Sequence, residues 1–161
     1  MELKKNTKVM VVGIGNLLLC DEGVGVHAVN RLQEMELPPG VELIDGGTHS
    51  YDLVDVFCQA ENLIIIDALQ GGGEPGTIYR APLEDLGLKP EENATSIHQL
   101  HFIEAVRMVN LMGHQPRVMV FGVEPARIDW DLEMSPEATA KFPRLIELII
   151  QEIRGIMGEE G

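Results

Sequence analysis

The chain has 161 residues, of which 45% are hydrophobic, and carries a formal net charge of −14. This length predicts a single domain over residues 1–161, and the acidic balance argues against nucleic acid or membranes as partners. The start lacks a signal-peptide pattern and no apolar run reaches about 18 residues, which predicts a cytoplasmic protein. The two isolated cysteines, Cys20 and Cys58, exclude a disulfide framework and a zinc knuckle.

The first predicted element is a buried strand at Val9–Val12. Its apolar residues do not alternate with polar ones, which is typical of a parallel strand covered on both faces. A glycine-punctuated loop follows, and then a helix is predicted over Gly23–Met35. Asp21 and Glu22 fall at the beginning of this helix, where carboxylates either cap free amides or belong to a functional site.

Two more carboxylates follow predicted strands. A strand at Val41–Ile44 leads into Asp45, a short helix is predicted over Tyr51–Gln59, and the most apolar strand, Asn62–Ala68, contains Asp67 near its end. Parallel strands with right-handed crossovers end at one edge of a sheet, so we expect these aspartates and Glu22 to converge there. Alternatively, each aspartate only hydrogen-bonds the amides of the next loop.

The second half predicts an edge strand and completes an α/β fold. The glycine-rich residues 71–76 are too few for a crossover helix, so the strand at Thr77–Arg80 should run antiparallel. The elements predict three layers, α/β/α, around a five-stranded, mostly parallel sheet with one antiparallel edge strand. The remaining elements are a helix at Ile97–Met112, a strand at Arg117–Val123 and a last helix capped by Ser135, begun by Pro136 and kinked or restarted at Pro143.

Histidines near the same edge extend the candidate site. His98 falls in the first turn of its helix and His101 one turn later. Two carboxylates and one imidazole can form an open divalent-metal site that suits nickel as well as zinc, although His98 could equally face solvent. We expect His101 to support the site from behind the ligands without binding the metal, expect His114 at the surface, and identify no partner for His27 or His49.

The sequence lacks the motifs of several familiar classes of enzyme. The sequence contains no GxSxG elbow, P-loop or HExxH motif. The dinucleotide fingerprint lacks its third glycine, because Leu18 occupies that place. The carboxylates and histidines therefore remain the best candidates for function.

Taken together, the motifs resemble those of the nickel-iron hydrogenase maturation endopeptidases, over nearly the whole length of the chain. No single motif is as specific as the combination. The matching motifs are Gly13-Ile14-Gly15-Asn16, Leu19-Cys20-Asp21-Glu22-Gly23-Val24-Gly25, Asp45-Gly46-Gly47-Thr48, Ile66-Asp67-Ala68, the glycine-rich residues 71–76 with Thr77-Ile78-Tyr79, and Ser96-Ile97-His98-Gln99.

The resemblance implies a fold and an activity. It implies a phosphorylase/hydrolase-like α/β/α fold with strand order 2-1-3-5-4 and an antiparallel fourth strand. It also implies an endopeptidase that removes the C-terminal extension of the hydrogenase large-subunit precursor after nickel insertion. The nickel then belongs to the substrate, and other divalent ions are able to occupy the site.

Site residues carry over by motif. Glu22, Asp67 and His98 correspond to the metal-binding residues, and Asp45 to a recognition or support residue; no further catalytic residue is assigned. The chain departs from the family pattern at Leu17, where proline is common, and at Cys20, where glycine is usual.

Two other functions use the same residues. One is a non-enzymatic nickel-binding chaperone, and the other is a metal-independent acid protease of related fold. Cleavage of a nickel-loaded precursor distinguishes all three.

Overall fold

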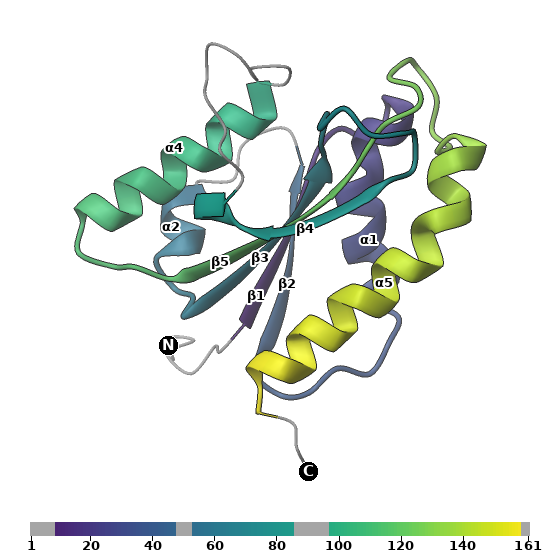
Figure 1. The fold of residues 1–161 in the computed structure, drawn as a ribbon. Helices are drawn as coiled ribbons and strands as arrows, with labels where there is room; N and C mark the ends of the chain where they lie inside the picture. The colour runs from purple at the N-terminus through teal and green to yellow at the C-terminus, as the bar shows by residue number, and fades with distance from the viewer. Residues whose placement is uncertain (1–8, 48–52, 86–96, 159–161) are drawn as a thin grey trace.

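The computed structural model of the chain describes residues 9–47, 53–85 and 97–158, with side chains from residue 102 onward in the last range. Figure 1 shows a central sheet with helices on both sides. The strands are β1 (Val9–Ile14), β2 (Val41–Gly47), β3 (Asn62–Ala68), β4 (Ile78–Pro82) and β5 (Arg117–Val123). The helices are α1 (Val24–Leu32), α2 (Leu53–Phe57), α4 (Ile97–Leu111) and α5 (Pro136–Ile156), with short 3-10 helices η1 (Cys20–Gly23) and η2 (Leu83–Asp85).

The five strands form one sheet in the order β2-β1-β3-β5-β4. The pairs β1–β2, β1–β3 and β3–β5 are parallel, whereas β4 is antiparallel to β5, with Tyr79 opposite Gly122. The predicted antiparallel edge strand is therefore confirmed. It pairs with β5 and not with β3, which precedes it in the chain, as the resemblance implied.

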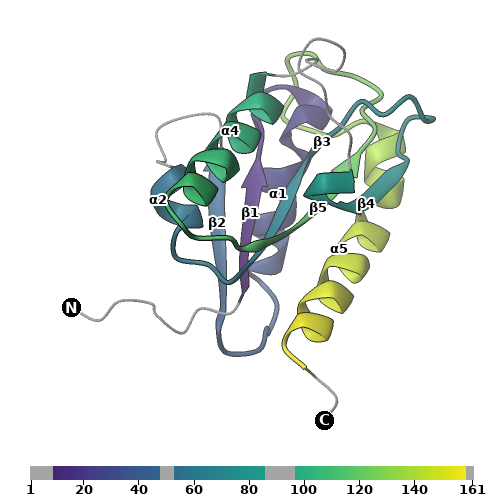
Figure 2. The same ribbon diagram turned by 60° about the vertical axis from the view of Figure 1, so that its left-hand side comes forward.

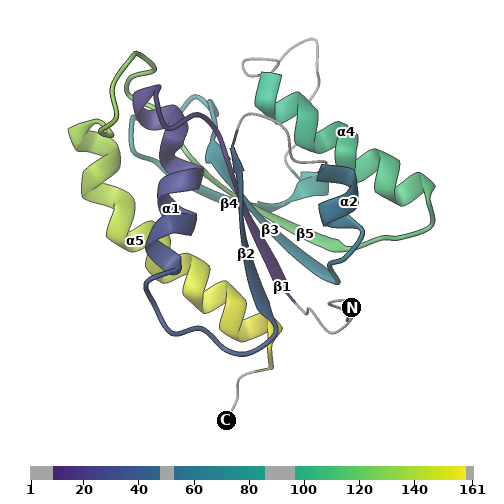
Figure 3. The ribbon, with the colours of Figure 1, turned by 180° about the vertical axis from the view of Figure 1, so that it is seen from behind.

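Apolar side chains cover both faces of the sheet. Along β3, Ile64 and Ile66 pack in one core with residues of α1 and α5, while Leu63 and Ile65 pack in another with residues of α2 and α4. Figure 3, seen from behind, shows α1 and α5 on one side of the sheet and α2 and α4 on the other. The continuous apolar run of β3 is explained by burial on both faces.

The predicted helices differ from those of the structure mainly around the first and the last helix, and the helices predicted to end at Gln59 and Met112 end at Phe57 and Leu111. The helix expected over Gly23–Met35 is divided into η1 and α1, which ends at Leu32. α5 continues through Pro143 without restarting, because its apolar side, including Leu145 and Ile149, is buried against the sheet. The start of the helix predicted from Tyr51 lies outside the described residues.

Strands β1 and β2 run further than predicted, to Ile14 and Gly47, so Asp45 is inside β2.

Among the helices of the described ranges, none has both the length and the apolar character needed to cross a lipid bilayer.

Candidate active site

Glycines bring the first helix and its preceding loop onto the carboxyl end of β3. A Cβ atom on Gly25 would lie 2.1 Å from the carbonyl oxygen of Ile66, and one on Gly13 would lie 2.1 Å from the carbonyl oxygen of Gly25. Gly15 has a φ of +130°, and a Cβ there would lie 1.9 Å from the carbonyl oxygen of Glu22. Only glycine fits these positions, and the tight packing places η1 against β3.

Glu22 of η1 and Asp67 of β3 form a buried carboxylate pair. Their exposed fractions are 8% and 1%. Asp67 Oδ1 accepts a hydrogen bond from the amide of Ala68 at 2.8 Å, whereas Asp67 Oδ2 is buried and has no hydrogen-bond partner among the described residues. Burial raises the pKa of Asp67 well above its ordinary value, and the charge of Glu22 raises it further.

Asp45 lies at the same edge of the sheet but is not part of this pair. It is exposed in β2 and stands opposite Gly13, so β1 separates it from β3. The carboxylate that acts on the pKa of Asp67 is Glu22. The predicted convergence on one edge therefore holds for all three acids, and close approach is found for Glu22 and Asp67.

The backbone of His98 belongs to the first turn of α4, and its side chain lies outside the described residues. The beginning of α4 lies toward the end of the sheet where η1 meets β3, as Figures 1 and 2 show. Within the part of the chain that the structure describes, no group of three potential metal ligands occurs. His98 as the third ligand therefore stays a prediction.

The other histidines form no metal-ligand group with the carboxylate pair among the described residues. His114, expected at the surface, is half-buried, and its Nε2 atom lies 2.6 Å from the carbonyl oxygen of Ala60. His27 hydrogen-bonds the backbone of Leu132, and burial lowers its pKa. His49 and the side chain of His101 lie outside the described residues.

Asp21 has a role that sequence reasoning missed. Its carboxylate accepts hydrogen bonds from the amide of Ala126 at 2.8 Å, from the amide of Arg127 at 3.3 Å, and from the amide and hydroxyl of Ser135 at 2.8 and 2.7 Å. Ser135 in turn caps α5 by accepting from Ala138. Asp21 therefore ties η1 to the loop before α5, which the sequence could not indicate because the partners are 105 and more residues away.

Cys20 adopts a conformation that favours glycine. It is the one described non-glycine residue with a positive φ, 55°, a backbone conformation that glycine adopts more readily than other residues. Its amide donates to the carbonyl oxygen of Asp131 at 2.8 Å, and its side chain is buried. Burial and the charge of Asp21 raise the pKa of the thiol, which keeps it protonated at neutral pH.

Glu124 organises the glycine-rich segment between β3 and β4. Its Oε1 atom accepts from the amide of Gly71 at 2.9 Å and from the hydroxyl of Tyr79 at 2.5 Å, and Tyr79 accepts from the amide of Gly73 at 2.9 Å. Burial and the bond to Glu124 raise the pKa of Tyr79. This acid follows β5 directly, which is the sequence signal that could have identified it.

The chain is similar to known proteins over most of its length. A family profile described as hydrogenase maturation protease matches residues 26–152. The hydrogenase expression/formation protein HupD of Rhodobacter capsulatus is 34% identical over 153 residues, which cover 93% of this chain and 73% of that protein. The hydrogenase 2 maturation protease of Escherichia coli is 30% identical over 156 residues, which cover 91% of each chain.

The structural comparison gives the same result. The solved structure of the hydrogenase maturating endopeptidase HybD from E. coli is similar with a TM-score of 0.83 and 29% sequence identity, covering 92% of this chain and 93% of that one. A hydrogenase 2 maturation peptidase from Thaumarchaeota archaeon SCGC_AB-539-E09 gives a TM-score of 0.71 at 27% identity, covering 92% and 99%. On the evidence of the matched profile, these relatives and the shared fold, the chain belongs to the hydrogenase maturation protease family.

Proposed function

We propose that this endopeptidase removes the C-terminal extension of a nickel-iron hydrogenase large-subunit precursor after nickel has been inserted. We also propose that Glu22, Asp67 and His98 bind the nickel that the precursor carries. Membership of the maturation protease family supports the class of reaction. The name of the E. coli relative, hydrogenase 2 maturation protease, supports a hydrogenase as the substrate.

The observation that carries the metal proposal is the unpartnered oxygen of Asp67. Burying a carboxylate without a partner is costly, and a second carboxylate nearby adds to the cost. A divalent cation at this position would compensate both negative charges. Nickel accepts carboxylate and imidazole ligands, so the donor set of Glu22, Asp67 and His98 fits it.

The same residues suggest how cleavage is directed. When the precursor presents its nickel to the carboxylate pair, the peptide bond to be cut is held beside the pair, and proximity lowers the entropic part of the barrier. Cys20 is buried and protonated, which argues against a thiolate nucleophile. Asp45 is exposed at the same edge, which supports a role for it in contacting the precursor peptide.

A second candidate, a metal-independent acid protease, is favoured by one specific observation. Two neighbouring carboxylates with one pKa raised well above normal are the arrangement that acid proteases use to share a proton. In this alternative, Asp67 would act as a proton donor and the nickel of the precursor would be irrelevant to cleavage.

Cleavage of nickel-loaded and nickel-free precursor separates these functions. Mass spectrometry detects the cleaved product formed by the wild-type protein and by Asp67→Asn. Asp45→Asn is the comparison variant, because Asp45 lies at the same edge but outside the buried pair. The proposal expects cleavage of the loaded precursor alone, its loss in Asp67→Asn, and reduced but measurable cleavage in Asp45→Asn. Equal cleavage of both precursor forms would favour the acid protease.

A further inference from the structure

The loop between β5 and α5 carries a cluster of exposed apolar side chains close to the candidate active site. Ile128, Trp130 and Leu132 have exposed fractions of 46%, 74% and 65%, and Leu18, from the loop after β1, is 50% exposed. We call these four residues the Trp130 patch. Single exposed apolar residues are ordinary, but a group that includes a largely exposed tryptophan is typical of an interaction surface.

Backbone hydrogen bonds hold the two parts of the patch together. The amide of Asp131 donates to the carbonyl oxygen of Leu18 at 2.9 Å, and the amide of Cys20 donates to the carbonyl oxygen of Asp131 at 2.8 Å. Leu19 and Asp131 form an isolated parallel bridge. The Trp130 patch is therefore one surface formed by two segments that are distant in the sequence.

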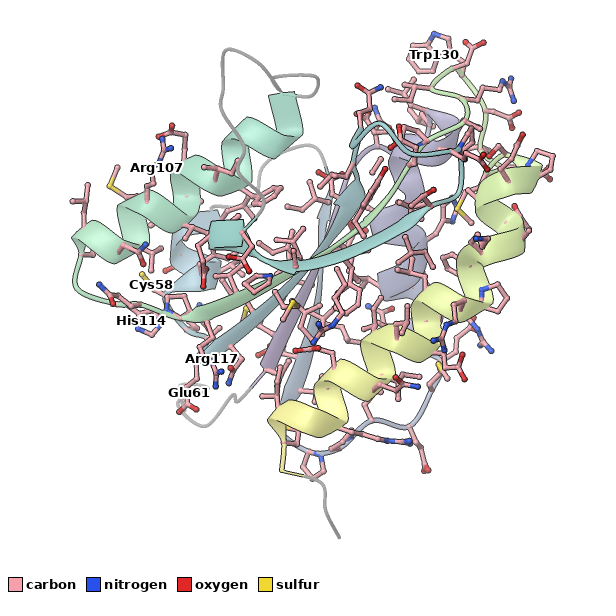
Figure 4. The ribbon with its side chains drawn as sticks, in the orientation of Figure 1. Cys58, Glu61, Arg107, His114, Arg117 and Trp130 are labelled. Atoms are coloured by element: carbon pink, nitrogen blue, oxygen red, sulfur yellow. The ribbon has the colours of Figure 1, made fainter. Side chains whose placement is uncertain are left out.

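The loop is also fixed with respect to the carboxylate pair. Asp21, which precedes Glu22, accepts hydrogen bonds from the amides of Ala126 and Ser135, at the two ends of the loop. Figure 4 shows Trp130 at the outer end of the loop, at the end of the molecule where α1 and α5 begin. A surface held in this way loses little conformational entropy when a partner binds.

The charges of the loop and of the whole chain indicate which kind of partner segment the patch binds. Charged and apolar residues alternate from 127 to 133, and one basic residue, Arg127, stands among three acidic ones, Asp129, Asp131 and Glu133. Arg127 already forms an ion pair with Asp131 at 3.2 Å. Because the whole chain carries a net charge of −14, a segment with apolar and basic side chains is the complementary partner.

We infer that the Trp130 patch docks an apolar, basic segment of the hydrogenase large-subunit precursor, beside the residues that receive its cleavage site. This inference rests on the proposed function. In this inference the loop before α5 binds the protein part of the substrate, and the carboxylates separately contact its metal. Exposed tryptophans in such surfaces contribute strongly to binding.

Trp130 is the only tryptophan in the chain, which gives a direct binding test. Enzyme labelled with fluorotryptophan has a single fluorine resonance, and the cognate precursor, left unlabelled, is titrated into it. We expect the resonance to shift or broaden in proportion to the bound fraction. A resonance that stays unchanged at saturating precursor overturns the inference, and so does a resonance that changes with enzyme concentration alone, because the patch is then covered by a second copy of the chain.

Kinetics of patch variants provide the second test. Trp130→Ser and Leu132→Ser should raise KM for the precursor about tenfold and about threefold while kcat stays within twofold. Glu133→Lys should raise KM at low salt and weaken its dependence on ionic strength. The matched control is Leu111→Ser at the end of α4, where the side chain is 83% exposed away from the patch, and it should change neither constant.

The outcomes separate the two proposals. If the wild type cleaves the precursor and the patch variants have the KM of the control, the docking surface is wrong and the proposed function stands. If the wild type neither binds nor cleaves the precursor, the proposed function is wrong, and the docking surface falls with it.

Discussion

Replacing Asp67 with asparagine should stabilise the protein and abolish its activity. The side chain is 1% exposed, and its Oδ2 atom has no hydrogen-bond partner among the described residues. Asparagine keeps an oxygen to accept from the amide of Ala68, as Oδ1 does now at 2.8 Å, and it removes the buried charge next to Glu22. It is also a weaker metal ligand than a carboxylate.

The size of the stabilisation follows from the cost of the buried charge, because the amide group of asparagine is itself a polar group at the place of Oδ2. A charged group without a partner costs more to bury than a neutral one, whose own cost is about 1–3 kcal/mol, and we expect the free energy of unfolding to rise by an amount of about that size. For a domain of this size the corresponding rise in Tm is roughly 2–12 °C. Thermal unfolding of metal-free wild type and Asp67→Asn, followed by circular dichroism with chelator present, measures the difference.

The difference should also depend on pH. Because the pKa of Asp67 is raised in the folded state above its ordinary value of 3.8, the folded protein holds a proton that the unfolded chain releases. The wild type therefore loses stability as pH rises from about 3.8 through the raised pKa, and this loss is complete above it. Asp67→Asn lacks this loss, so its advantage should be small near pH 4 and should grow as pH rises toward neutrality.

Two results would refute this reasoning. A variant that is less stable than the wild type at neutral pH would mean that the carboxylate is well solvated or paired in the folded state. A variant that cleaves nickel-loaded precursor at the wild-type rate would reduce Asp67 to a residue that orders the loop after β3. Asp45→Asn, exposed at the same edge, is the control and should change stability by less than about 0.5 kcal/mol.

Three further predictions concern neighbouring residues. Precursor binding should weaken as pH falls through about 6.5, because a ligating imidazole must be neutral, and His98→Ala should remove this pH step in binding titrations. Asp21→Ala should lower the free energy of unfolding by about 3 kcal/mol in urea titrations, because it leaves several buried donors without an acceptor; an effect below about 1 kcal/mol would contradict the bonding described. Alkylating reagents should modify Cys58 before Cys20 and leave cleavage intact, as peptide mapping and activity assays can establish; loss of cleavage in folded, alkylated protein would indicate a catalytic thiol.

The order of helices and strands was readable from the sequence because it depends on local patterns. The unbroken apolar run ending at Asp67 indicated a strand covered on both faces, and the short glycine-rich segment excluded a crossover helix before β4. The position of Glu22 and Asp67 at one edge followed from the rule that parallel strands end together. The spacing of apolar residues along a helix or strand reflects which of its faces are buried, so this information can be read from one sequence.

Other features depended on which segments meet in space, and local patterns do not contain that information. A hairpin between β3 and β4 was equally compatible with the residues, and only the family resemblance placed β5 between them. The bonds of Asp21 to Ser135 and the placement of the Trp130 patch beside η1 join segments more than a hundred residues apart. Such contacts are selected by packing of the whole chain, because their loop-closure cost is offset only when the surrounding core is formed.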